Sequence, residues 1–381
     1  MTKRHIGFNK PYLTGKETKY ILESVETRKI SGDGFFTKKC HDFFEKRFGF
    51  KKVLLTTSCT DALEMAAILI NTNTGDEIIA PSYTFVSSVN AFVLRGAKIV
   101  FCDSEADTPN IDISKIEELI TPKTKAIVVV HYAGIAVDMD PLMELAQRHD
   151  IFVIEDAAHS IDSYYKGRPL GSIGHLAAFS FHETKNVISG EGGMLVINDE
   201  RFSERAEIIR EKGTNRSAFF RGEVDKYGWV DIGSSFLPSD IIAAFLYAQL
   251  ENLNDIQKKR KYIWDYYFKY LKELSEKGFF KFQKLPDFAT NNAHMFYILC
   301  RSPEERDKLI IYLKSKEIYA VFHYLSLDKS PFYKDKTENH EMKNSDYYTD
   351  HLLRLPLYYE LSDDDLNYVV ENIKTYYREN G

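Results

Sequence analysis

Two short apolar runs decide the fold: Ile151-Phe152-Val153-Ile154-Glu155-Asp156 and, further along, Leu176-Ala177-Ala178-Phe179-Ser180-Phe181. The first run ends abruptly in an acidic pair, and the second reaches Lys185 within four residues. Short apolar runs of this kind are typical of buried parallel strands, and ligands in open α/β sheets gather at the carboxyl ends of such strands. We therefore expect Asp156 and Lys185 to face one crevice.

A carboxylate and an amine in one crevice suit pyridoxal phosphate. The aldehyde of this cofactor needs an amine that can form a Schiff base, and its ring nitrogen must stay protonated if the ring is to accept electrons. Lys185 would supply the amine, and Asp156 would pair with the ring nitrogen. The two residues alone leave a simpler alternative open, because a lysine is usually a solvated surface charge and an aspartate often forms a turn.

The residues before this stretch alternate between predicted strands and predicted helices. The predicted strands cover residues 53–57, 77–80, 98–102, 126–131 and 151–155, and the helices between them cover 62–69, 86–94, 113–120 and 141–148. This alternation predicts an α/β fold with a mostly parallel central sheet and helices on both faces. After the loop Gly190-Glu191-Gly192-Gly193, residues 194–198 return as a strand, which puts Lys185 at a bend.

Several residues near the strand ends are candidates for holding the cofactor. Ser58, Cys59 and Thr60 lie between a strand and a helix, where hydroxyl groups and free N–H groups can bind a phosphate, although capping alone is the commoner role. Phe85 follows another strand and could lie flat against a planar ring or pack in the core. His159 could contact the same ring or be structural, and Ser180 could add a hydroxyl to the phosphate.

The chain from residue 205 to residue 229 is basic and rich in aromatic residues. Guanidinium groups bind diphosphates bidentately and aromatic rings stack on bases, so this segment could hold a nucleotide-linked substrate; a solvated loop is the alternative. The candidates for contacting the substrate are Lys212, Asn215, Arg216, Arg221, Tyr227 and, at the end of a predicted strand over 318–322, His323.

The length of 381 residues suffices for two domains. We place the boundary near residue 250, so that residues 1–250 form a large cofactor-binding α/β domain with an N-terminal segment. Residues 251–381 would form a small C-terminal α/β domain. Its predicted elements are helices over 256–274, 303–316 and 363–377 and strands over 295–299 and 318–322.

Composition excludes several classes of protein. The formal charge of −6 argues against a nucleic-acid-binding protein. The four cysteines show no C-x-x-C spacing, so no zinc or other metal site and no disulfide framework is indicated, and we expect reduced thiols in a cytoplasmic protein. No apolar run approaches the 18 residues of a membrane span, and the first residues lack the apolar core of a secretory signal.

Six runs of sequence together resemble one family over almost the whole chain. They are Thr56-Thr57-Ser58-Cys59-Thr60, Pro81-Ser82-Tyr83-Thr84-Phe85-Val86, His131-Tyr132-Ala133-Gly134, Glu155-Asp156-Ala157-Ala158-His159, Phe179-Ser180-Phe181-His182-Glu183-Thr184-Lys185-Asn186 and Gly190-Glu191-Gly192-Gly193. The chain is thereby similar to the DegT/DnrJ/EryC1/StrS family of pyridoxal phosphate-dependent nucleotide-sugar aminotransferases. The resemblance implies the aspartate-aminotransferase fold, known as fold type I, with active sites at a homodimer interface.

The resemblance also implies roles for individual residues. Lys185 would be the Schiff-base lysine that moves the proton, Asp156 would pair with the pyridine nitrogen, and Phe85 would cover one face of the ring. Cys59, Thr60 and Ser180 would hold the phosphate, with His159 beside the ring. Many relatives carry a Gly-x-Asn motif that contacts the phosphate across the dimer interface; here the matching place reads Gly233-Ser234-Ser235, so Ser234 stands in that position.

Four further runs resemble, within the family, the members that aminate C4 of dTDP-4-dehydro-6-deoxy-D-glucose. They are Gly32-Asp33-Gly34, Arg210-Glu211-Lys212-Gly213-Thr214-Asn215-Arg216, Val224-Asp225-Lys226-Tyr227 and Asp231-Ile232-Gly233-Ser234-Ser235. This similarity implies L-glutamate as donor and dTDP-4-amino-4,6-dideoxy-D-galactose as product, for enterobacterial common antigen or an O-antigen-type polysaccharide. Amination at C3 and the opposite C4 configuration stay open. Relatives with histidine in place of the lysine are dehydratases, so Lys185 favours transamination over a dehydratase or a non-catalytic regulator.

Overall fold

The computed structural model describes residues 4–336 and 341–380. Its largest sheet has seven strands: β1 (Val53–Thr56), β2 (Glu77–Pro81), β3 (Lys98–Cys102), β4 (Thr124–Val130), β5 (Phe152–Asp156), β8 (Leu176–Ser180) and β9 (Gly193–Ile197). They lie in the order β1-β9-β8-β5-β4-β2-β3, and β9 runs antiparallel to both of its neighbours while the other pairs are parallel. The mostly parallel sheet that the sequence predicts is confirmed.

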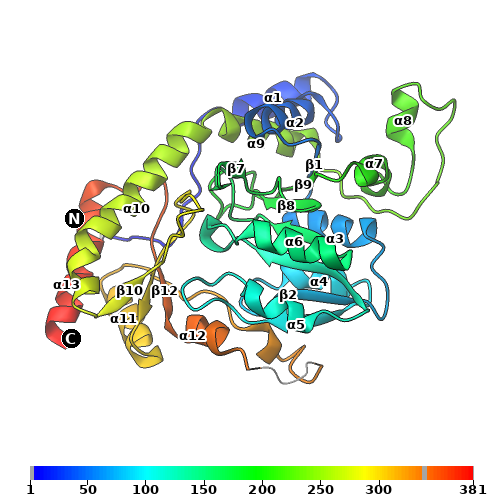
Figure 1. Cartoon of the computed structure of the whole chain (residues 1–381). Coiled ribbons are helices and arrows are strands. Elements are labelled where there is room, and N and C mark those ends of the chain that lie inside the picture. The colour runs from blue at the N-terminus through cyan, green and yellow to red at the C-terminus, as the bar shows by residue number, and fades with distance from the viewer. Residues whose placement is uncertain (1–3, 337–340, 381) are drawn as a thin grey trace.

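Both faces of this sheet are covered by helices (Figure 1). Within β2, Ile78 and Ala80 pack in one hydrophobic core and Ile79 in another, because successive side chains of a strand point to opposite faces. The helices of the first core are α3 (Cys59–Leu69), α4 (Ser87–Val93) and α7 (Ser203–Arg210); those of the other face are α2 (Phe35–Phe48), α6 (Met139–His149) and α9 (Asp240–Glu251). Burial on both sides explains why the strands read as continuous apolar runs.

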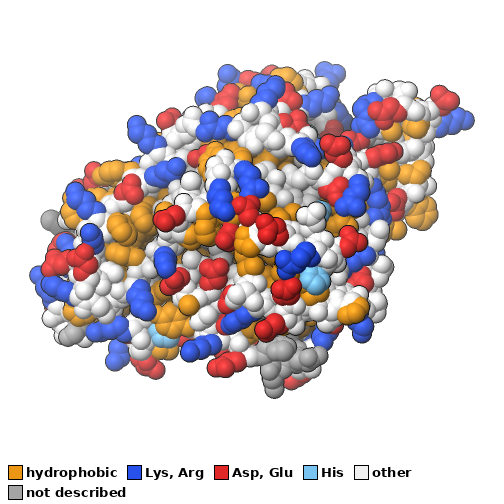
Figure 2. All heavy atoms as spheres, viewed as in Figure 1, with side chains coloured by type: hydrophobic (Ala, Val, Ile, Leu, Met, Phe, Trp, Pro, Cys, Tyr) orange, Lys and Arg blue, Asp and Glu red, His pale blue; other side chains and the backbone are white. Residues whose placement is uncertain are grey.

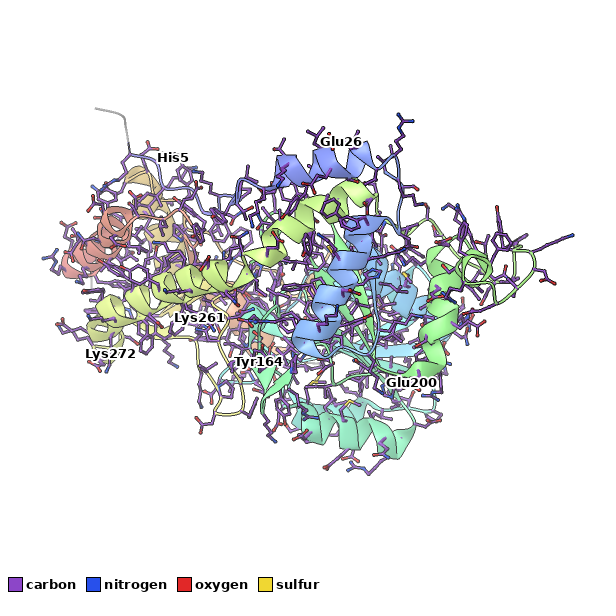
Figure 3. The ribbon with its side chains drawn as sticks, turned by 90° about the horizontal axis from the view of Figure 1, so that it is seen from above. His5, Glu26, Tyr164, Glu200, Lys261 and Lys272 are labelled. Carbon is purple, nitrogen blue, oxygen red and sulfur yellow. The ribbon has the colours of Figure 1, made fainter. Side chains whose placement is uncertain are left out.

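A second, three-stranded antiparallel sheet lies in the C-terminal part of the chain. It has the order β10 (Phe280–Phe282), β11 (Phe296–Cys300) and β12 (Leu352–Leu355). Helices α10 (Leu253–Glu276), α11 (Pro303–Ser315) and α13 (Asp363–Asn380) share a core with it. Figure 3 shows α10, marked by Lys261 and Lys272, running out along this part of the molecule. We keep the division near residue 250 as a proposal.

The other elements are short or lie at the edges of the two sheets. They are helices α1 (Glu17–Glu26), α5 (Ile116–Leu119), α8 (Arg216–Phe220) and α12 (Lys343–His351), strands β6 (Tyr164–Tyr165) and β7 (Arg168–Pro169), and the 3₁₀ turns η1 (Ile113–Lys115), η2 (Tyr132–Gly134), η3 (Glu200–Phe202) and η4 (Leu327–Lys329). Among the residues that the structure describes, no helix is both long and apolar enough to cross a membrane.

The prediction of a strand over residues 318–322 is wrong. Ile318 forms an isolated bridge with Ile6, and Val321 forms another with Arg354. The segment changes its partner after three residues, so no ladder of hydrogen bonds grows along it. The third strand of the small sheet is β12 instead. The sequence analysis missed β12 because it has only four residues, and it missed α12 because that helix is largely polar.

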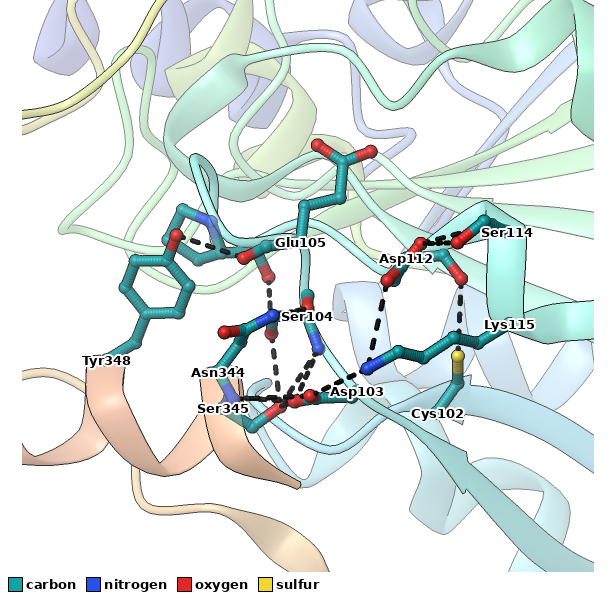
Figure 4. A network of polar contacts seen from close by, with 11 residues as sticks. Cys102, Asp103, Ser104, Glu105, Asp112, Ser114, Lys115, Asn344, Ser345 and Tyr348 are labelled. Carbon is teal, nitrogen blue, oxygen red and sulfur yellow. Dashed lines mark hydrogen bonds and ion pairs between the residues drawn. The ribbon is translucent and has the colours of Figure 1, made fainter. Parts of the chain in front are cut away.

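Asp103, at the end of β3, holds α12 against the large sheet (Figure 4). Its Oδ1 accepts hydrogen bonds from the backbone N–H (2.8 Å) and the hydroxyl (2.9 Å) of Ser345, and its Oδ2 accepts from the backbone N–H of Asn344 (3.2 Å) and from Lys115 (3.1 Å). The first N–H groups of a helix have no acceptor within the helix, and Asp103 supplies that acceptor for α12. Burial raises the pKa of Asp103, but these hydrogen bonds outweigh it and hold the pKa below its ordinary value.

Replacing Asp103 with alanine should lower the free energy of unfolding by about 2 to 3 kcal/mol, because several buried donors lose their acceptor. Urea unfolding followed by circular dichroism at pH 7 measures this, with Asp107→Ala, an exposed aspartate paired with Lys284, as control. A carboxyl group with a lowered folded pKa stabilises the fold above its unfolded pKa of about 3.9 and loses that effect as the pH falls through the folded pKa. The difference should therefore shrink below about pH 4; equal stability of the two variants at pH 7 would contradict this role.

Candidate active site

A cavity of about 480 Å³ lies where the carboxyl ends of the large sheet meet the small sheet. The strand ends of the large sheet contribute Ser58, Cys59, Thr60, Thr84, Phe85, Ser87, Ser88, Val130, Asp156, His159, Ser180 and Lys185 to its lining. The C-terminal part contributes Arg260, His294, Met295, His323, Tyr324, Arg354, Leu355 and Leu357. The cavity thus has one wall from each part of the molecule.

The structure brings Asp156 and Lys185 together in this cavity. Parallel pairing of β5 with β8 sets Asp156 opposite Ala178, and the N–H of Ala157 donates to the carbonyl of Ala178 at 2.8 Å. Lys185 follows β8 on a tight turn in which its N–H donates to the carbonyl of His182 at 2.9 Å. One paired edge of the sheet therefore fixes the backbone of both residues.

The carboxylate of Asp156 is buried and accepts two hydrogen bonds. The hydroxyl of Ser88 donates to Oδ2 at 2.6 Å, and the N–H of Ala158 donates to Oδ1 at 3.1 Å. Burial raises the pKa of Asp156, while these two donors and the nearby Lys185 oppose the rise. Burial also lowers the pKa of Lys185, which favours the neutral amine. A buried carboxylate is stabilised by a cation, and a protonated ring nitrogen would supply one.

The start of α3 has the features of a phosphate site. Ser58 caps the helix by accepting from the N–H of Asp61 at 3.0 Å, and Cys59 and Thr60 are its first two residues. A Cβ on Gly193 would lie 2.2 Å from the carbonyl carbon of Ser58, so only glycine lets β9 pass this close to the helix start. Free N–H groups and the positive end of the helix dipole favour an anion here.

Two aromatic side chains, Phe85 and His159, also line the cavity. Phe85 lines the cavity and keeps 54% of its surface exposed, so it is free to cover a ligand and is not a core residue. His159 is buried and stacks on His294, with ring centroids 4.2 Å apart and an angle of 18° between the planes. The Nδ1 of His159 accepts the N–H of Ala133 at 3.3 Å, and burial lowers its pKa well below the ordinary value. The neutral ring therefore carries its proton on Nε2.

Six residues that the sequence analysis assigned to the site do not line this cavity. They are Ser234, Lys212, Asn215, Arg216, Arg221 and Tyr227. They belong to residues 211–235, here called the arm, which carries α8 and stands clear of the body (Figure 1). Sequence adjacency cannot reveal the direction in which a segment projects. His323 does line the cavity, and the assignment of the other six to the site stays a prediction.

The sequence analysis also missed several lining residues. Ser88 lies in the first turn of α4 and donates to Asp156, and no local signal in the sequence connects these two residues. His294 and Arg354 come from the small sheet and its approach, far along the chain, and no local signal connects them to Lys185. Their place follows from tertiary packing alone.

Comparison with known proteins places the chain in a family. The sequence model of the DegT/DnrJ/EryC1/StrS aminotransferase family matches residues 11–374. The chain belongs to this family. It is 32% identical over 375 residues to the GDP-perosamine synthase of Escherichia coli O157:H7, covering 98% of this chain and 99% of that one. It is 31% identical over 390 residues to the spore coat polysaccharide biosynthesis protein SpsC of Bacillus subtilis, covering 97% and 96%.

Solved structures agree with this membership. A Streptococcus pneumoniae protein assigned as a sugar aminotransferase, solved in a PMP form, superposes with a TM-score of 0.90 at 26% identity and covers 98% of this chain and 100% of that one. The same protein was also solved in a PLP form, with a TM-score of 0.89. The family member described here is therefore a pyridoxal phosphate-dependent sugar aminotransferase of fold type I.

The residues of the cavity fit that cofactor. Asp156 would pair with the ring nitrogen, the start of α3 with Cys59 and Thr60 would hold the phosphate, and Lys185 would attach to the aldehyde carbon. When bound, the cofactor supplies an electron sink for the carbon that loses a proton. Lys185 would hold the proton taken from the substrate carbon, which its lowered pKa permits.

Replacing Lys185 with alanine should lower the rate of amino transfer by at least about 100- to 10,000-fold, since the general base is lost. A coupled assay for 2-oxoglutarate release measures the rate, and Lys166→Ala, a surface lysine paired with Asp140, is the matched control. A Lys185→Ala protein with wild-type turnover would refute the assignment of the base.

Proposed function

We propose that this aminotransferase moves the amino group of L-glutamate to C4 of dTDP-4-dehydro-6-deoxy-D-glucose. The product would be dTDP-4-amino-4,6-dideoxy-D-galactose, a building block for a surface polysaccharide such as enterobacterial common antigen or an O antigen. The observation that carries the proposal is the lysine and the carboxylate that share one buried cavity. A histidine at position 185 would have favoured a dehydratase, and Lys185 supports transamination.

The choice of acceptor is supported by the runs in which the chain resembles the C4-aminating members. Three of these runs meet at the base of the arm. Arg210 of the second run is buried and donates to Asp33 of the first at 2.5 Å, and Glu211 forms a bridge with Ser235 of the fourth. The arm is thereby fixed at both ends, which suits a segment that must present side chains to a substrate.

We further propose that the active unit is a homodimer in which the arm of one subunit reaches the cavity of its partner. Large hydrophobic side chains are exposed on the arm (Figure 2): Phe220, Tyr227, Trp229, Val230 and Ile232. Trp229 keeps 82% of its surface exposed. Exposed apolar surface of this kind marks an interaction site. A second copy would bring Ser234 to the phosphate and the basic residues of the arm to the substrate diphosphate.

A GDP-linked 4-ketosugar is the second candidate acceptor. It is favoured by the similarity to GDP-perosamine synthase over nearly the full length of both chains. The cavity residues described above are assigned to the cofactor and to amino transfer. We therefore expect the arm to recognise the nucleotide of the substrate. The two acceptors share a carbonyl at C4 and differ in the nucleotide.

The purified protein, loaded with pyridoxal phosphate, should convert L-glutamate and dTDP-4-dehydro-6-deoxy-D-glucose to a 4-amino sugar. Nuclear magnetic resonance of the product gives the position and the configuration of the amine, and the corresponding GDP-linked 4-ketosugar is the comparison substrate. We expect a kcat/KM for the dTDP substrate at least tenfold above that for the GDP substrate, which corresponds to about 1.4 kcal/mol. Preference for the GDP substrate, or an amine at C3, would contradict the proposal.

A further inference from the structure

His294 is a buried histidine in the cavity wall with no part in the chemistry assigned to Lys185 and Asp156. It comes from the segment before β11 and lies flat against His159, with ring centroids 4.2 Å apart and 18° between the planes. Both rings line the cavity that also holds Asp156 and Lys185. A cofactor ring that reaches from Asp156 to Lys185 therefore shares this cavity with a pair of stacked imidazoles.

The proton of His294 is placed by Asn186, the residue directly after Lys185. The side-chain nitrogen of Asn186 donates to the backbone carbonyl of Asn292 at 3.0 Å and to the side-chain oxygen of Gln257 at 2.8 Å. A backbone carbonyl can only accept, so the first of these contacts fixes which end of the amide is nitrogen. The oxygen end faces Nδ1 of His294 at 2.8 Å and accepts its N–H. The neutral ring of His294 therefore carries its proton on Nδ1.

The surroundings of His294 keep its ring neutral. Burial lowers its pKa well below the ordinary value, and four basic side chains around it lower the pKa further: His159, Lys185, Arg260 and Arg354. The acceptor of its N–H is an amide, which adds no negative charge that would stabilise a protonated ring. His294 therefore presents a neutral, planar face to His159.

The backbone of His294 is also held in place. Its N–H donates to Oδ1 of Asn292 at 3.0 Å, and its carbonyl accepts from Arg260 at 2.6 Å. The side-chain nitrogen of Asn292 donates to the carbonyls of His159 (2.7 Å) and Ile161 (2.8 Å). One asparagine thus fixes the backbone of both stacked histidines, which preorganises the pair before a ligand binds.

We propose that His294 and Asn186 are positioning residues that hold the ring of His159 against the cofactor. A ring stacked on one face of His159 restricts its rotation, and aromatic pairs contribute stabilisation beyond the area they bury. A side chain that is already held in its bound orientation loses less conformational entropy when the ligand arrives. The inference concerns the cofactor end of the cavity, so it holds for any ketosugar that accepts the amine.

The apparent Kd for pyridoxal phosphate measures this role without turnover. Free pyridoxal phosphate is achiral, so the visible circular dichroism of the full-length protein reports only the bound cofactor and its orientation. His294→Ala should raise the apparent Kd about threefold to tenfold and weaken the dichroism at saturation, as for loss of one aromatic pair. Asn186→Leu should act in the same direction, because the N–H of His294 then has no acceptor.

A double-mutant cycle shows whether His294 acts through His159. In a His159→Ala protein, the further change His294→Ala should alter the apparent Kd by less than about twofold, because the ring that His294 supports is already gone. His294→Phe keeps a flat ring and should recover part of the affinity that His294→Ala loses. An equal effect of His294→Ala in both backgrounds would overturn the proposal, as would wild-type affinity and dichroism in His294→Ala.

Far-ultraviolet circular dichroism of each variant separates a change of fold from a change of ring position. His149→Ala, at the end of α6 and beside Glu117, should change neither the affinity nor the visible dichroism. Should His294→Ala not fold, Asn186→Leu with and without His159→Ala forms the same cycle, and wild-type affinity in Asn186→Leu would contradict the proposal. No sugar is added in these titrations, so their outcome is separate from that of the proposed function.

Discussion

The pairing of β5 with β8 is the contact on which the site depends. These strands lie next to each other in the sheet but are separated in the chain by a loop, and their register sets Asp156 opposite Ala178. Side chains alternate between the two faces of a strand, so a shift of one residue would turn Asp156 away from the cavity. The distance that matters for the chemistry, between one carboxylate and one amine, is thus set by backbone hydrogen bonds.

Glu155, the acid next to Asp156 in the chain, has a structural role. Glu155 points to the opposite face, contacts His131 at 2.9 Å and accepts the N–H groups of Gly171 (2.7 Å) and Ile173 (2.8 Å) in the loop that leads to β8. Burial raises the pKa of Glu155, but His131 and the N–H groups of Gly174 and Gly171 outweigh it and keep the pKa below its ordinary value. One acid of the pair therefore anchors the loop, and the other faces the ligand.

Those parts of the site that local sequence controls could be predicted. Apolar runs ending in polar residues located Asp156, Lys185 and the start of α3, because a strand end and a helix start are local features. The residue before the arm, Arg210, is held by Asp33, and these two residues are far apart in the chain. Arg354 lies in a four-residue strand whose partners are set by the whole C-terminal part. Long-range packing of this kind leaves no periodic pattern to detect.

The cavity combines the carboxylate of Asp156 with the amine of Lys185 and two guanidinium groups, those of Arg260 and Arg354. Burial lowers the pKa of His294 and His323 well below the ordinary value, so both rings are neutral. The most direct measurement is a crystal structure with pyridoxal phosphate. We predict density continuous with the Nζ of Lys185, the phosphate at the start of α3, and a carboxylate oxygen of Asp156 about 2.7 to 3.2 Å from the ring nitrogen. A cofactor attached to another lysine, or a ring nitrogen without Asp156 beside it, would contradict the account.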